Sequence, residues 1–174
     1  DIEIDLVSAH RNRTRIQLHG LPVPKSVAGF FYFIMSLNAN DRLIEVAKAA
    51  IDSGAVGLTA INTIRAMAVD VETQRPVLSN KFGGLSGNAI RPVAARCVFE
   101  LHQELDVPIM GCGGVSRWEH AVELLLAGAS AVQIGTGLYE GYGIFRRVTR
   151  GLTEYMKKKK VKGVGDLVGL SHRF

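Results

Sequence analysis

The sequence predicts an α/β protein built around a parallel sheet. Short apolar runs alternate with segments of helical spacing, and glycine or polar residues separate them. The composition agrees, because 47% of the 174 residues are apolar, enough for one packed core. We therefore expect residues 1–174 to form a single domain.

The predicted strands are short apolar runs that each lead into a turn. They cover residues 30–35, 56–61, 107–110 and 131–134, and residues 2–7 offer one more strand at the front. The helices show apolar residues at helical spacing over 43–51, 89–105, 117–126 and 143–158. Ser116 and Glu119 have the spacing of a capping box, and Pro92 suits a first helical turn.

The connection over residues 64–88 is longer than ordinary links in an α/β domain, which favours a functional loop. Repeated strand–helix units of this kind fit either a doubly wound sheet or part of a barrel whose other strands lie elsewhere. The local patterns alone leave both architectures open.

Two consecutive strands end in glycine-rich turns, Gly111-Cys112-Gly113-Gly114 and Gly135-Thr136-Gly137. Glycine lets backbone N–H groups approach phosphate oxygens closely, and two such turns after the last strands of a barrel are typical of its phosphate site. Tight turns without a ligand are the alternative. The dinucleotide fingerprint GxGxxG is absent from a strand–helix setting.

Asn62 and Thr63 also follow a strand. The Asn62 amide can hydrogen-bond a planar heterocycle as donor and acceptor, although an asparagine there is also an ordinary turn residue.

Composition excludes several other classes. No apolar run reaches the roughly 18–20 residues of a membrane helix, and no histidine or cysteine spacing suggests a metal site. The net charge of +5 gathers in two basic runs, 11–15 and 157–160, which we interpret as solvated surface and not as a nucleic-acid site. Cys97 and Cys112 suggest no disulfide framework, which favours the cytoplasm.

The start of the chain carries no signal-peptide pattern, because it is acidic, and it lacks an initiator methionine. We therefore expect a fragment or a processed chain.

Four linked motifs resemble the class 1 dihydroorotate dehydrogenases. They are GLTAINT (57–63), GGLSGNAIRP (83–92), PIMGCGGV (108–115) and AGASAVQIGT (127–136). Their order and spacing match through residues 36–150, and GGLSG together with the preceding INT is the most discriminating pair.

The resemblance implies the carboxyl-terminal portion of a (β/α)8 barrel that binds FMN and oxidises dihydroorotate to orotate in pyrimidine synthesis. It assigns the FMN phosphate to Gly113, Gly114, Gly135 and Thr136. It further assigns the flavin surroundings to Ser86 and Gly87, and the substrate to Asn62 and Thr63. As partners it implies a homo-oligomer and an iron–sulfur flavoprotein subunit for electron transfer.

Residues 1–35 match the family poorly. When residues 2–10 are laid on the family's N-x-S-(C/S)-P-N segment, Ser8 takes the place of the catalytic base and Ala9 that of the proline. Aligning the next turn puts Ile34 where the family carries a flavin-contacting lysine. Two alternatives therefore stay open: an impaired or split half-barrel that binds flavin or phosphate, and another FMN barrel such as a tRNA dihydrouridine synthase.

Overall fold

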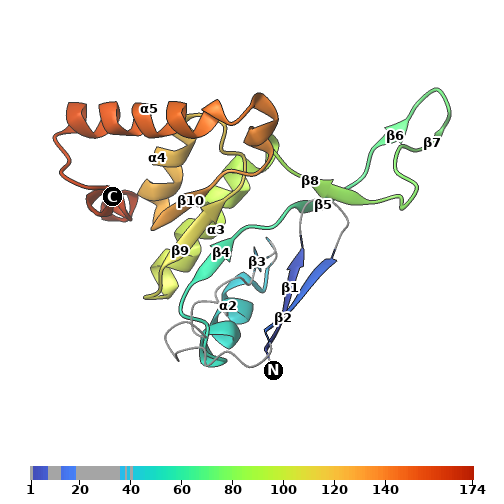
Figure 1. Cartoon of the computed structure of the whole chain (residues 1–174), viewed down its shortest axis with the longest axis horizontal. Coiled ribbons are helices and arrows are strands. Elements are labelled where there is room, and N and C mark those ends of the chain that lie inside the picture. Colours follow the sequence, from blue (N-terminus) through green and yellow to red (C-terminus); the bar gives the residue numbers. More distant parts are fainter. Residues whose placement is uncertain (1, 8–12, 19–35, 38, 40) are drawn as a thin grey trace.

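The computed structural model describes residues 2–7, 13–18, 36–37, 39 and 41–174 (Figure 1). Three of the sequence predictions fall outside these ranges: the strand at 30–35, the candidate base Ser8, and Ile34. The first described strand of the main sheet, β3 (Ser36–Leu37), directly follows the predicted strand.

A parallel sheet of four strands forms the centre of the molecule. Its members, in spatial order, are β10 (Ala131–Gln133), β9 (Ile109–Cys112), β4 (Leu58–Ala60) and β3. All three pairings are parallel, with Gln133 opposite Cys112, Ala60 opposite Gly111, and Leu37 opposite Ala60. The parallel arrangement predicted from residues 56–61, 107–110 and 131–134 is therefore confirmed.

Helices follow the strands in sequence order. They are α2 (Leu43–Asp52), α3 (Arg91–Glu104), α4 (Trp118–Ala127) and α5 (Gly143–Lys159), with the 3-10 turns η1 (Asn88–Ile90) and η2 (Thr136–Glu140) before α3 and α5. Pro92 lies in the first turn of α3, as predicted. Gly128, with φ of 121°, ends α4, also as predicted.

The order of strands and helices decides between the two architectures. Each helix packs against the next one in the chain, α2 on α3, α3 on α4 and α4 on α5, so they form one continuous layer. The strands also keep their sequence order from β3 to β10. In a doubly wound sheet the strand order reverses and helices cover both faces. A single layer of helices outside sequentially ordered strands is the arrangement of a (β/α) barrel segment.

Three antiparallel ladders lie outside this sheet. The front strand β1 (Ile2–Val7) pairs with β2 (Arg13–Leu18), so the strand predicted over residues 2–7 is present but lies outside the parallel sheet. The two strands are close in sequence, and an antiparallel ladder is what a short connection permits, whereas a parallel pair needs a crossover.

The long connection after β4 contains the other two ladders. They are β5 (Ile64–Ala66) with β8 (Gly83–Leu85), and β6 (Val69–Asp70) with β7 (Arg75–Pro76). Together they form an arm that extends away from the sheet and helices (Figure 1). The predicted loop is therefore a two-tier arm with its own pairing.

The core lies between the sheet and the helix layer. Leu58 and Ala60 of β4 and Ile109 of β9 meet Ala47 of α2 and Val98 of α3, and all five are fully or almost fully buried. Cys97 also lies in this core, as predicted, and both cysteines are free thiols. Within the described part of the chain, none of the helices has the length and hydropathy to cross a bilayer.

The carboxyl-terminal turns η3 (Val164–Leu167) and η4 (Leu170–Arg173) pack back onto α4. Ser171 Oγ donates to the Leu126 carbonyl at 2.7 Å, and His172 Nε2–H donates to the Ala127 carbonyl at 3.0 Å. The His172 ring also stacks on Phe99 of α3, with 3.8 Å between ring centroids, and lies 4.8 Å from the His102 ring.

Partial burial, and secondarily the neighbouring His172, lower the pKa of His102, while Asp106 opposes the shift. The folded pKa then lies below the unfolded value of about 6.5, and the unfolded chain binds more protons. Stability is therefore lost as the pH falls through about 6.5. Urea unfolding at pH 7.5 and 5.5 checks this. We expect the His102→Gln variant to lose less stability than the wild type between these two values. An equal loss in both proteins would show that His102 does not contribute.

Candidate functional site

The carboxyl ends of the four parallel strands define one edge of the sheet. Each predicted site residue that the structure describes comes shortly after one of these strands or after the arm in the chain. Beyond β4, the Ile61 N–H donates to the Cys112 carbonyl at 2.7 Å, and the Asn62 N–H donates to the Leu37 carbonyl at 2.9 Å. These bonds continue the sheet past the strands and hold Asn62 next to the end of β3. The residues after β3, β4 and β9 therefore start from fixed positions.

Three turns from distant parts of the chain meet at this edge. Gly114, with φ of 72°, lies so close to the segment before α3 that a Cβ there would come within 2.8 Å of the Gly87 carbonyl oxygen and 3.2 Å of Asn88 Cα. Gly87, with φ of 81°, has Thr136 Oγ1 3.7 Å from the position of its missing Cβ. Both glycines have a positive φ that other residues rarely adopt, and Gly114 also needs the close approach that glycine permits. The structure thus brings together Gly87, Gly114 and Thr136, as the resemblance implied.

The last of these turns is partly open. A Cβ on Gly135 would meet no atom within 4 Å, so this glycine is not required by packing within the chain. Thr136 is half-buried and begins η2. An exposed glycine beside a threonine hydroxyl leaves backbone and side-chain donors accessible to a ligand.

Asn62 and Thr63 are exposed at the root of the arm. Asn62 Oδ1 accepts a hydrogen bond from the Thr63 N–H at 2.8 Å, which orients the amide. Its Nδ2 group makes no hydrogen bond with any described residue, so Asn62 offers a ligand its donor side. Thr63 packs against Gly84 of β8, where a Cβ would collide with its side chain.

Thr59, the middle residue of β4, is a buried polar residue at the sheet. Its side chain points to the face of β4 opposite Leu58 and Ala60, because strand residues alternate. Thr59 is 3% exposed, and among the described residues its hydroxyl is the buried side-chain oxygen that has no hydrogen-bond partner. A buried hydroxyl without a partner is uncommon in folded proteins.

The turn after β9 differs from its prediction. Ser116 does not cap α4: the N-cap residue is Arg117, which makes no side-chain cap bond, so Ser116 and Glu119 form no capping box. The helix begins one residue later than the box requires, which makes His120 the third helical residue. His120, rather than Glu119, contacts the backbone before the helix: its Nδ1 lies 3.3 Å from the Ser116 N and 3.1 Å from the Gly114 carbonyl oxygen.

Sequence reasoning missed both His120 and Arg91. Arg91, at the start of α3, donates from Nε to Asn88 Oδ1 at 3.1 Å and forms an ion pair with Glu123 of α4. It thereby links the Gly87 turn to the helix that follows Gly114. Neither residue stands out in the sequence, because an arginine or histidine on a helix is ordinary. In the sequence, His120 is marked only by its position three residues after Arg117. That position has meaning only when the first residue of the helix is known.

Cys112 and the metal-ligating residue types bear on acid–base and metal chemistry at this edge. Burial raises the pKa of the Cys112 thiol, so this cysteine stays protonated at neutral pH and is a poor nucleophile or base. In the described ranges, no three His, Cys, Asp or Glu side chains gather to hold a metal ion.

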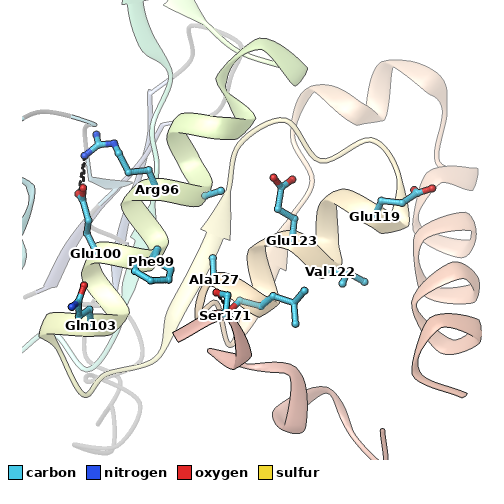
Figure 2. Close-up of a pocket in the computed structure, with 11 residues that line it drawn as sticks. Arg96, Phe99, Glu100, Gln103, Glu119, Val122, Glu123, Ala127 and Ser171 are labelled. Carbon is cyan, nitrogen blue, oxygen red and sulfur yellow. Dashed lines mark hydrogen bonds and ion pairs between the residues drawn. The ribbon is translucent and has the colours of Figure 1, made fainter. Parts of the chain in front are cut away.

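A large groove of about 720 Å³ lies elsewhere, between α3 and α4. Figure 2 shows Phe99 and Val122 on its walls and Glu119, Glu123 and Glu100 around its rim. None of the predicted site residues lines it. The candidate site is therefore the glycine edge of the sheet and not the groove on the helical side.

Comparisons with known proteins point to one family. The family model described as dihydroorotate dehydrogenase matches residues 36–156. The chain is 47% identical over 128 residues to a protein of Pyrococcus abyssi named dihydroorotate dehydrogenase B (NAD(+)), catalytic subunit, which covers 73% of this chain and 43% of the relative. A protein of the same name from Methanocaldococcus jannaschii is 43% identical over 151 residues, covering 86% of this chain and 49% of the relative.

A solved structure of similar fold is the ligand-free DHODH from Eimeria tenella. It superimposes with a TM-score of 0.66 and 28% identity, over 81% of this chain and 40% of that one. The chain thus spans less than half the length of these relatives. The family match covers more than half of the chain, including the three turns that meet at the glycine edge. The chain therefore belongs to the dihydroorotate dehydrogenase family and corresponds to part of the barrel of its members.

Proposed function

We propose that the protein oxidises dihydroorotate to orotate in pyrimidine synthesis with FMN as its cofactor, and that this chain supplies the phosphate end of the cofactor site. The observation that carries the proposal is the meeting of Gly87, Gly114 and Thr136 at the carboxyl ends of the parallel strands. Ligands of such barrels bind at this edge.

The residues present fit the phosphate of FMN. Gly114 has no room for a side chain, and Gly135 leaves its backbone open beside the Thr136 hydroxyl. Arg117, and Arg91 in its ion pair with Glu123, lie close to His120 and the turn that it contacts, which suits an anion. We assign the phosphate to Gly113, Gly114, Gly135 and Thr136, and the flavin surroundings to Ser86 and Gly87.

The chemistry divides between cofactor and protein. FMN, when bound, accepts the hydride that dihydroorotate loses from C6. In our proposal, Asn62 donates from its Nδ2 group to an oxygen of the substrate, with Thr63 beside it. Ser8, outside the described residues, is the proposed base for the proton at C5.

Partners follow from the names of the relatives. Since these are called catalytic subunits and NAD(+)-dependent, we propose that this protein too acts with a second subunit, an iron–sulfur flavoprotein that carries electrons to the acceptor. We also propose a homo-oligomeric, cytoplasmic enzyme. The alternative of a tRNA dihydrouridine synthase gains nothing from these relatives, which carry the name of the dehydrogenase.

A second candidate function is a flavin-binding barrel with impaired turnover. The alignment of Ile34 with the family's flavin-contacting lysine favours it, because an apolar residue cannot stabilise negative charge that develops on the flavin. The two candidates differ in turnover and agree in FMN binding, so separate experiments test them.

The first experiment substitutes Gly114 by Ala and measures FMN affinity by quenching of flavin fluorescence. The new Cβ would lie 2.8 Å from the Gly87 carbonyl oxygen, so the two turns must separate. We expect the dissociation constant to rise at least about tenfold, the equivalent of roughly 1.4 kcal/mol. Gly141→Ala is a matched control, because Gly141 also has a positive φ, of 93°, but open space around it. Equal affinities of the two variants would contradict the assigned phosphate site.

The second experiment substitutes Ile34 by Lys in the complete barrel and measures flavin reduction by dihydroorotate. If Ile34 replaces the family's lysine, a cation there should raise the rate by about 10²–10³-fold, the usual size of one such electrostatic contact. FMN affinity should change much less, because the phosphate turns are intact. Normal turnover in the wild type, with no gain in the variant, would show that the family's lysine has its counterpart elsewhere in this protein.

A further inference from the structure

His120 is a buried polar side chain that faces back toward the glycine edge. It is 4% exposed, and it is the third residue of α4. Its Nδ1 lies 3.1 Å from the Gly114 carbonyl oxygen, 3.3 Å from the Ser116 N and 3.4 Å from Ser116 Oγ. One ring nitrogen thus connects the two ends of the Gly114–Ser116 turn.

The two backbone partners of Nδ1 have opposite polarity. The Gly114 carbonyl can only accept, and the Ser116 N–H can only donate, so a neutral ring serves one of them fully. The contact with the Gly114 carbonyl is the shorter, and we infer from it that the proton is on Nδ1. Burial lowers the pKa of His120, as do the charges of Arg91 and Arg117, whereas the Gly114 carbonyl and Glu123 oppose the shift. The ring is therefore neutral at neutral pH, with Nδ1–H as its donor.

The hydrogen bond to Gly114 sets the orientation of a whole peptide plane. In a trans peptide the C=O of one residue and the N–H of the next point in opposite directions. When His120 holds the Gly114 carbonyl against α4, the Val115 N–H points away from the helix. The carbonyl oxygen, which would repel a phosphate oxygen, is also kept on the helix side of the turn.

We propose that His120 is a positioning residue for the phosphate-binding turn: by holding the Gly114 carbonyl, it orients the Gly114–Ser116 backbone for the phosphate of FMN. The inference rests on the proposed function, since it deepens the assignment of this turn as the phosphate site. Arg91, which is anchored to Glu123, packs against Gly114 in the same turn.

The test compares FMN with riboflavin, which differ by the phosphate alone. Dissociation constants from fluorescence titration of the full protein give the preference for FMN. Substituting His120 by Leu removes the donor at similar volume, and we expect the preference to fall about fivefold to thirtyfold, the range for a buried hydrogen bond of about 1–2 kcal/mol. Riboflavin affinity should stay within about twofold.

Two further variants separate positioning from general stability. His120→Asn places an amide N–H where Nδ1 lies and should restore most of the preference, while His120→Gln reaches the position of the other ring nitrogen and should not. This pair also keeps the test decisive if the leucine variant fails to fold. His172→Ala is the matched control, because His172 likewise bonds a backbone carbonyl of α4, at Ala127, far from the turn. It should lower stability without changing the ratio of FMN to riboflavin affinity.

The outcomes are distinguishable. If the wild type binds FMN no more tightly than riboflavin, the proposed phosphate site is wrong. If the wild type prefers FMN and all three His120 variants keep that preference, the phosphate site stands and the role of His120 is overturned. Equal losses in the Asn and Gln variants would also overturn it, because the role depends on a donor at Nδ1.

Discussion

The close approach of Gly114 to the Gly87 carbonyl is the constraint on which the candidate site depends. At this point the turn after β9 touches the segment that leads from the arm into α3, and there is no space for a side chain between them. The contact places Arg91 at the side of the turn and lets it reach Glu123 on α4. It also brings Thr136, from the turn after the next strand, within van der Waals reach of Gly87. Three segments separated in sequence therefore share one small volume.

Packing within the helix layer fixes the close approach of Gly114 to the Gly87 carbonyl. Small residues let α3 lie close to the turn, since a Cβ on Gly113 would come within 2.6 Å of Ala94 Cβ. α4 then packs against α3, and His120 and Glu123, three residues apart on α4, extend toward the Gly114 turn and Arg91. Protein interiors pack densely and shift little, so side chains held in this layer position the loops above them. The site is thus built on helix packing even though its ligand-facing groups are mostly backbone.

The greater length of the relatives bears on the two outer strands of the described sheet. Among the described residues, β10 pairs only with β9, and β3 only with β4. An eight-stranded barrel closes such edges with further strands, and the relatives are more than twice as long as the part that this chain matches. The Thr59 hydroxyl without a partner lies on the opposite side of β4 from the helix layer, where a closed barrel has its interior. The same closure would complete the surroundings of the cofactor, which the proposed function requires.

The sequence by itself determined the alternation of strands and helices, the parallel sheet, and the glycine turns of the candidate site, because these depend on local periodicity and on residues with special backbone freedom. The linked motifs also identified the family. The boundaries of α4 were not accessible in this way: Ser116 and Glu119 have capping-box spacing, yet the helix starts at Trp118, and His120 instead of Glu119 contacts the backbone of Ser116. The pairing of β1 with β2 and the two-tier arm were likewise decided by which chain segments lie close enough to bond. Only the tertiary structure placed Gly87, Gly114, Thr136, Arg91 and His120 together, since their contacts join residues from separate β–α units, and no local pattern encodes that distance.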